Sequence, residues 1–167
     1  MSDEFSRYAQ SRWTRLVHFG LLLGCEVHDA EDMAQSTLLK CFAQWDKVSA
    51  AMDTDAYVYK MLINEWRSRG RRRWVGEILS GHLPDRKTEQ LDSESIQRVD
   101  LIVALKKLSD EHRAVLLLRF YADLSETDTA RILRVPAGTV KSRSARALER
   151  LRELLSNTSA TETKIGH

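Results

Sequence analysis

The sequence is poor in the residues that interrupt helices or build disulfide frameworks. Its 167 residues include seven glycines, two prolines and two cysteines. A β-sandwich needs more frequent turns, so the composition predicts an all-α protein. Neither Cys25 nor Cys41 has a second cysteine at metal-ligand spacing. This absence argues against a zinc site and a disulfide framework, and it favours a reducing cytoplasm.

Long apolar runs and catalytic constellations are missing as well. The longest apolar run near the N-terminus, 19–25, is too short to span a bilayer, and the acidic start lacks the layout of a signal peptide. We therefore expect no membrane insertion. The Glu, Asp and His residues form no recognisable metal, nucleophile or acid–base arrangement. The sequence predicts a protein that is not an enzyme and needs no cofactor.

The net charge of +2 conceals local charge clusters. Acidic residues are frequent in the first third of the chain, whereas five arginines gather within 67–73. A small total charge is therefore compatible with local basic surfaces of the kind that bind nucleic acid.

Helical periodicity is interrupted once, between about 75 and 95, where glycine, serine and Pro84 replace the apolar pattern. This interruption predicts two small helical domains, 1–74 and 96–155, joined by a flexible linker at 75–95. The polar, threonine-rich tail at 156–167 is expected to be disordered. The expected helices are 5–23, 29–46, 54–73, 96–108, 110–122, 126–133 and 136–155.

The C-terminal domain contains the pattern of a helix-turn-helix. Ser125 is placed to cap a short helix, with Asp128 three residues later, and Pro136 suits the opening turn of a longer second helix. At about 100° per residue, the apolar face of that second helix and its outer face separate cleanly. The inner face holds Val140, Ser144, Ala147, Leu148 and Leu151, and the outer face holds Lys141, Ser142, Ala145, Arg146 and Glu149.

Such a second helix can enter a major groove, because small residues at Ser142 and Ala145 allow close approach and basic residues lie beside them. Arg143 and Arg150 flank this outer face. The alternative is an ordinary helical hairpin with a solvated face. The short first helix, tight turn and basic second helix together favour DNA binding.

The helix expected at 54–73 has two faces as well. Its packing face gathers Val58, Met61, Leu62 and Trp66, and its cationic face gathers Lys60, Asn64, Arg67 and Arg71. Basic side chains at this spacing can follow a phosphate backbone, and an amide can both donate to and accept from a base edge. A solvated face is the alternative, and the second DNA-reading helix downstream favours nucleic acid.

The helix expected at 29–46 presents a different surface. Its buried arc is expected to hold Ala34, Leu38, Cys41, Phe42 and Trp45, which leaves Asp32, Gln35, Ser36, Leu39 and Lys40 outward. Single exposed leucines are common, so Leu39 can be ordinary surface. We nevertheless favour a protein-binding patch here, and we expect Cys41 to be a core residue rather than a reactive thiol.

These segments resemble extracytoplasmic-function sigma factors of bacterial RNA polymerase. The stretch 105–152 resembles their region 4, and its most specific part, 138–143, reads GTVKSR. Two further stretches resemble region 2, 29–48 with DAEDMAQSTLLKCFAQWDKV and 55–73 with DAYVYKMLINEWRSRGRRR. Tyr57 stands where the family pattern more often has Trp.

The resemblance implies a role for each outward face. It implies −35 promoter contacts from Lys141, Ser142 and Arg146, with Arg143 and Arg150 on phosphates. It implies that Asn64 lies where a base of the −10 element is extruded, and that Lys60, Arg67 and Arg71 hold the released strand. The loop at 48–54 is the implied base-capturing loop.

The resemblance also implies the partners. Asp32, Gln35, Ser36 and Leu39 correspond to the surface that grips the β′ coiled coil of core RNA polymerase. The expected partners are this core enzyme, through its β′ and β subunits, and promoter DNA. Small sigma factors of this group are commonly held inactive by an anti-sigma protein that covers both domains, so an anti-sigma factor is a candidate partner.

The residues alone leave two alternative functions open. A helix-turn-helix regulator with an effector or dimerisation domain would bind duplex DNA without polymerase. A helical adaptor would bind protein alone, and its basic faces would tolerate charge removal.

Overall fold

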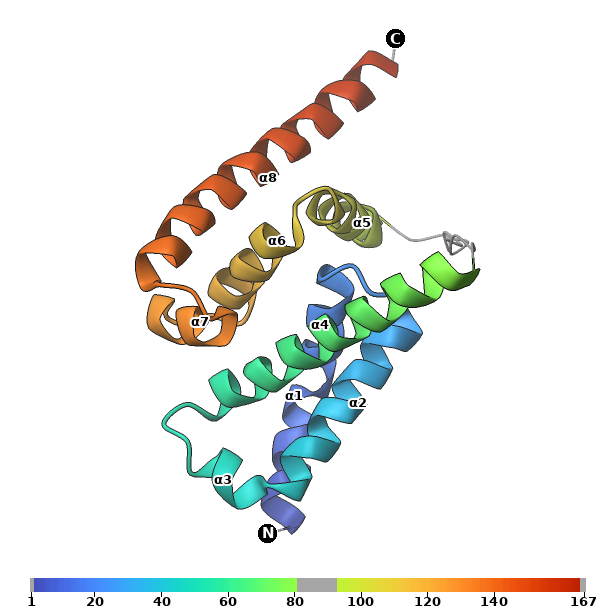
Figure 1. Cartoon of the computed structure of the whole chain (residues 1–167). Coiled ribbons are helices and arrows are strands. Elements are labelled where there is room, and N and C mark those ends of the chain that lie inside the picture. The colour runs from blue at the N-terminus through green and yellow to red at the C-terminus, as the bar shows by residue number, and fades with distance from the viewer. Residues whose placement is uncertain (1, 81–92, 166–167) are drawn as a thin grey trace.

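The computed structural model describes residues 2–80 and 93–165, and within these ranges every regular element is helical (Figure 1). The elements are α1 (Ser2–Leu22), α2 (Val27–Ala43), α3 (Trp45–Ser49), α4 (Thr54–Ser80), α5 (Ser93–Lys106), α6 (Asp110–Leu116), η1 (Leu117–Tyr121), α7 (Glu126–Leu133) and α8 (Ala137–Ile165). The predicted all-α fold with two helical domains is confirmed. None of the described helices is long and apolar enough to cross a bilayer.

Short polar side chains begin several of these helices. Ser125 Oγ accepts a hydrogen bond of 3.0 Å from the Asp128 amide, which confirms the predicted cap of α7. Ser109 caps α6 in the same way, and Asp53 Oδ1 accepts from the Ala56 amide at the start of α4. Each cap satisfies an amide that the first turn of a helix leaves without an intrahelical partner.

The N-terminal domain packs α1, α2 and α4 around a common core, with α3 closing one end (Figure 1). Its centre holds fully buried apolar side chains from all three long helices, among them Phe19, Met33 and Leu62. A Cβ on Gly20 would lie 3.0 Å from the Ala30 Cβ, so the glycine permits the close approach of α1 to α2. Gly24 ends this crossing with a φ of +101°, which a residue with a Cβ adopts only under strain.

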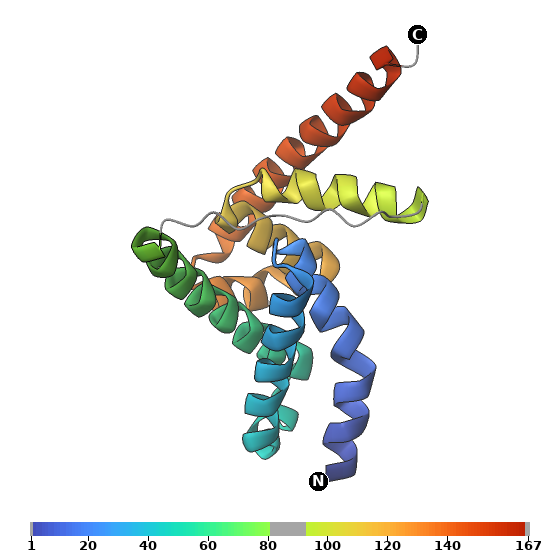
Figure 2. The same cartoon turned by 90° about the vertical axis from the view of Figure 1, so that its right-hand side faces the viewer.

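The C-terminal domain packs α5, α6 and α7 against the long helix α8 (Figure 2). α6 continues into η1, a π-helical turn, where the Ala122 amide bonds to the Leu117 carbonyl. The expected single helix at 110–122 is therefore two segments of different winding. π-helical turns are rare and frequently occur at functional positions.

The two domains are docked against each other, and their buried apolar residues form one cluster. Arg113 Nη1 in α6 donates a 2.8 Å hydrogen bond to the Leu23 carbonyl after α1. Arg15 Nη2 in α1 donates to the Tyr121 carbonyl in η1 at 2.9 Å, and the Phe19 and Tyr121 ring centroids are 6.1 Å apart. α7 also lies against α4.

Several sequence-based boundaries need correction. α4 runs to Ser80 and α5 begins at Ser93, so helix covers both ends of the expected linker at 75–95; residues 81–92 lie outside the described ranges. The expectation of a disordered tail at 156–167 is wrong for 156–165, which continue α8, because neither glycine nor proline interrupts that segment. Residues 166–167 are not described. The helix α3 was not expected, and it takes up the start of the loop expected at 48–54.

Candidate nucleic-acid interface

The second helix of the helix-turn-helix presents the predicted outer face. Val140 and Ala147 of α8 are fully buried against the domain core. The side chains expected to face outward are all exposed, namely Lys141, Ser142, Ala145, Arg146 and Glu149. The N-terminal half of α8 therefore offers two cations beside two small residues. Such a surface fits into the major groove of a DNA duplex.

The turn and the flanking arginines set the position of this helix. Arg134 ends α7 in the left-handed conformation, with φ at 58°, and α8 begins three residues later. Arg143 Nη2 lies 3.6 Å from Glu111 Oε2 of α6. Arg150 pairs with Glu153, one turn further along α8. Nothing in the sequence pointed to Glu111, because 32 residues separate it from Arg143 along the chain.

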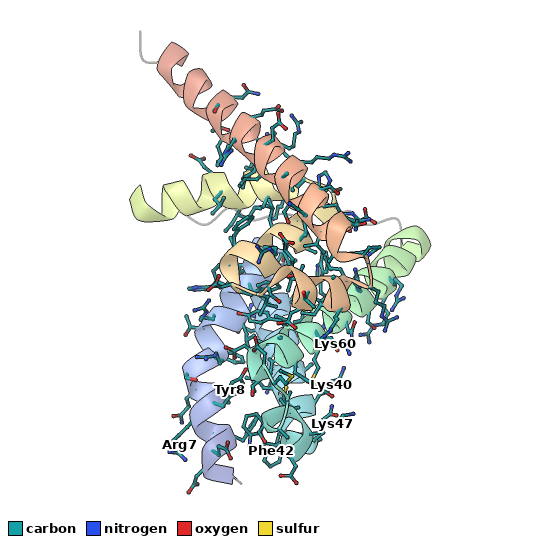
Figure 3. All side chains as sticks on the ribbon, turned by 90° about the vertical axis from the view of Figure 1, so that its left-hand side faces the viewer. Arg7, Tyr8, Lys40, Phe42, Lys47 and Lys60 are labelled. Carbon is teal, nitrogen blue, oxygen red and sulfur yellow. The ribbon has the colours of Figure 1, made fainter. Side chains whose placement is uncertain are left out.

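The cationic face of α4 also lies where the wheel predicts. Lys60, Asn64 and Arg71 are exposed, and Arg67 is half-buried, while Val58 and Leu62 are fully buried. Figure 3 shows Lys60 projecting from α4. The face carries an amide between cations, which suits a strand whose backbone is anionic and whose bases are unstacked.

A buried carboxylate fixes α4 against α2, and the sequence analysis did not identify it. Glu65 has a side-chain exposure of only 8%; its Oε2 lies 2.7 Å from Lys40 Nζ and its Oε1 lies 3.0 Å from Arg69 Nε. Arg69 also donates to Ser36 Oγ. The hydrogen bond from Lys40, and then that from Arg69, hold the pKa of Glu65 below its ordinary value despite burial. Glu65 is the neighbour of Asn64, so this network sets the rotation of the cationic face.

The loop before α4 carries an unusual exposed side chain. Residues 50–53 connect α3 to α4, and Met52 at the tip is fully exposed. Asp53 holds the end of the loop by capping α4. An apolar, polarisable side chain on a short anchored loop can contact the face of an unstacked base.

The outer face of α2 and the side of α1 form an apolar groove of about 390 Å³. Leu39 is 62% exposed, so its predicted outward position is confirmed, and Gln35 lines the groove beside it. The expected burial of Phe42 is wrong: it is 55% exposed, because α1 covers only one side of its ring through Phe5, at a centroid distance of 5.1 Å. The groove is lined by Phe5, Ser6, Ala9, Trp13, Gln35, Leu38, Leu39 and Phe42.

The four residues expected to bind protein are not equivalent. Asp32, Gln35 and Leu39 are exposed on α2, whereas Ser36 is half-buried and engaged by Arg69. Cys41 is fully buried, and burial raises the pKa of its thiol to about 11. It is a core residue, as the sequence analysis expected.

Known proteins match this chain over most of its length. The family model for sigma-70, region 4 matches residues 104–153. An RNA polymerase sigma-E factor of Streptomyces avermitilis is 34% identical over 152 residues, which cover 91% of this chain and 85% of that protein. The ECF RNA polymerase sigma factor SigL of Mycobacterium tuberculosis is 31% identical over 151 residues, with 87% and 85% coverage. The chain belongs to the ECF sigma factor family.

The fold of this sigma factor is also that of a solved relative. The sigma factor RpoE of Bartonella quintana, crystallised in complex with the anti-sigma factor NepR, matches with a TM-score of 0.81 and 29% identity. The match covers 92% of this chain and 97% of that one. The predicted function as an RNA polymerase sigma factor is confirmed, and it is favoured over a regulator that acts without polymerase. Sigma factors are not enzymes in the catalytic sense.

Proposed function

We propose that this sigma factor reads the −10 element with the N-terminal domain, residues 1–74, and the −35 element with residues 96–155. Within these domains the reading helices are α4 and α8. The observation that carries the proposal is that each helix buries an apolar face and exposes a cationic one. The exposed face of α4 also carries the amide of Asn64, and that of α8 also carries the hydroxyl of Ser142.

At the −35 element, α8 enters the major groove with its N-terminal turns. Lys141, Ser142 and Arg146 contact base edges, because their exposed positions and hydrogen-bonding groups suit direct readout. Arg143 and Arg150 bind phosphates after exchanging their present carboxylate partners, Glu111 and Glu153, for the DNA backbone.

At the −10 element, α4 holds the separated strand. Asn64 reads an extruded base, and Lys60, Arg67 and Arg71 follow the backbone on either side. Unstacking a base costs a few kcal/mol, so new contacts have to offset it. The cationic face and Met52 at the tip of the 50–53 loop supply candidate contacts of both kinds, charge and apolar surface.

Core RNA polymerase binds the outer face of α2. Asp32 suits a basic partner, and Leu39 and Gln35 lie at the mouth of the apolar groove between α1 and α2. Ser36 contributes by holding Arg69 rather than by direct contact. The partner segments in polymerase are the β′ coiled coil for this patch and the β subunit for the C-terminal domain.

An anti-sigma factor is a further proposed partner. The support is that the similar RpoE sigma factor of Bartonella quintana was crystallised with the anti-sigma factor NepR. The cytoplasm is the proposed compartment, because RNA polymerase acts there.

The test of the polymerase patch is the affinity of core RNA polymerase for the purified chain. Asp32→Lys is expected to weaken binding about tenfold or more, because it places a cation where a basic partner surface is proposed. Glu26→Lys reverses a charge at the exposed N-terminal end of the same helix and is the matched control. Equal affinities for the Asp32 variant and the unaltered chain would refute the patch.

A further inference from the structure

The turn between α7 and α8 carries an arginine at a backbone position that favours glycine. Arg134 has a φ of 58° and a ψ of 48°, which lie in the left-handed region. Glycine enters this region without strain, and aspartate and asparagine enter it more readily than other side chains do. The other non-glycine residue of the described chain with a positive φ is an aspartate, Asp123. An arginine is therefore strained here, and the strain calls for an explanation from its side chain.

The turn itself does not need the arginine side chain. The amides of Arg134 and Val135 both donate to the Ala130 carbonyl, the second at 3.1 Å, so main-chain hydrogen bonds close the end of α7. Val135 then packs its half-buried side chain against the core. A cation at the end of a helix also interacts favourably with the helix dipole, but Arg131 already lies in the last turn of α7. A glycine at position 134 would keep these contacts and remove the strain.

The guanidinium of Arg134 is available to a partner outside the chain. Its side chain is exposed, and no hydrogen bond or ion pair joins it to another residue of the described ranges. The neighbouring arginines differ in this respect. Arg131 lies 3.8 Å from Asp128, and Arg143 lies 3.6 Å from Glu111. Arg134 can therefore bind an anion without first giving up a carboxylate.

The place of Arg134 follows from the proposed entry of α8 into a major groove. An α-helix with its side chains is about 10–12 Å across and the groove is about 12 Å wide, so the helix fills the groove. The first helix of a helix-turn-helix crosses the phosphate backbone, so the turn between the two helices lies at the rim of the groove. The residues between Arg134 and Lys141 that are exposed, Pro136, Ala137 and Gly138, are small, and they leave room for a phosphate backbone beside the arginine.

We propose that Arg134 binds a phosphate of the promoter duplex at the rim of the −35 groove, and that its strained backbone serves to place a cation there. The planar guanidinium donates N–H groups to two phosphate oxygens at once. Such a contact positions α8 over the bases that Lys141 and Ser142 read, and it carries no sequence information of its own. The inference rests on the proposed binding of α8 to the −35 element and adds a positioning residue to it.

Arg134→Gly tests the proposal, because it relieves the strain and removes the cation in one change. We expect the Tm of the full chain to rise by about 3 °C. We expect the affinity of the holoenzyme for a promoter fragment to fall about fivefold. A purely structural role would move stability and affinity in the same direction. Arg134→Lys keeps both the charge and the strain, so it should leave Tm unchanged and retain most of the affinity.

The promoter fragment is taken from a start site that the unaltered chain selects with core RNA polymerase, and binding is measured by fluorescence anisotropy over a range of salt concentrations. Loss of one phosphate contact should reduce the slope of log affinity against log salt by about 1 and leave the upstream motif unchanged. Lys107→Ala removes an exposed cation outside both reading helices and should not change the slope. Asp123→Gly relieves the other left-handed residue and should cause no loss of affinity.

An Arg134→Gly variant with the affinity and salt slope of the unaltered chain would overturn the proposal. So would a variant that loses Tm together with affinity, because Arg134 would then be part of the fold. Lys141→Ala is measured in the same series to test α8 itself. If Lys141→Ala weakens binding and Arg134→Gly does not, only the Arg134 contact is wrong. If neither weakens binding, the proposed role of α8 at the −35 element fails, and the Arg134 contact fails with it.

Discussion

Replacing Glu65 by Gln removes one buried charge while keeping the volume of the side chain. The wild-type carboxylate receives two charge-assisted hydrogen bonds, from Lys40 at 2.7 Å and from Arg69 at 3.0 Å. Breaking a fully buried ion pair costs about 3–5 kcal/mol. Lys40 and Arg69 are 57% and 30% exposed, so water screens part of this loss. We expect the free energy of unfolding to fall by about 2 kcal/mol.

For a chain of this length, about 2 kcal/mol corresponds to a decrease in Tm of about 6 °C. The assay is thermal unfolding followed by circular dichroism at pH 7. Glu4→Gln is the control, because Glu4 is exposed in the first turn of α1. Its Tm is expected to change by no more than about 1–2 °C.

The dependence on pH gives a second check of the same reasoning. The folded-state pKa of Glu65 is lowered, so its stabilising contribution is present above the unfolded pKa, which is about 4.3. The contribution is lost as the pH falls through the lowered folded pKa. The Tm difference between wild type and Glu65→Gln should therefore be full at pH 7 and shrink below about pH 4. A difference that is absent at pH 7, or that stays constant down to acid pH, would refute the role assigned to the carboxylate.

Three further predictions concern the fold. Ser125→Ala removes the acceptor for the Asp128 amide and should lower the free energy of unfolding by about 1 kcal/mol in urea titrations; no change would mean that the cap is dispensable. Phe19→Ala empties a fully buried position and should cost about 3–5 kcal/mol by the same measurement. Burial raises the pKa of Cys41 to about 11, so alkylation of the native chain at pH 8, followed by peptide mass mapping, should modify Cys25 well before Cys41; the reverse order would contradict this burial.

Helix faces could be predicted from the sequence where one stripe of apolar residues decides the packing. Val140 and Ala147 are seven residues apart, two turns of a helix, and both are buried, so Lys141 and Arg146 are exposed as predicted. The same logic placed Asn64 correctly on α4. It failed for Phe42, because exposure at the end of α2 depends on how far α1 extends over it, and periodicity within one helix carries no information about that.

Contacts between distant segments could not be predicted in this way. Glu65 finds Lys40 only because α2 and α4 pack together, and 25 residues separate the pair in sequence. Arg15 and Tyr121 are 106 residues apart, and their hydrogen bond depends on docking of the two domains. The short helix α3 has only five residues, too few for a periodic pattern to distinguish it from a loop.

The central claim is that two separate helices read two separate promoter elements, and start-site mapping tests it most directly. Core RNA polymerase transcribes a pool of fragmented genomic DNA with the unaltered chain, with Lys141→Ala or with Asn64→Ala. Lys107→Ala, which alters an exposed lysine outside both reading helices, is the control. The unaltered chain and the control should yield discrete starts that share two spaced upstream motifs. Lys141→Ala should weaken selection of the upstream motif alone and Asn64→Ala that of the downstream motif alone. Transcription start sites that do not share two upstream motifs would contradict the claim. So would variants that bind polymerase but lose selection of both motifs equally.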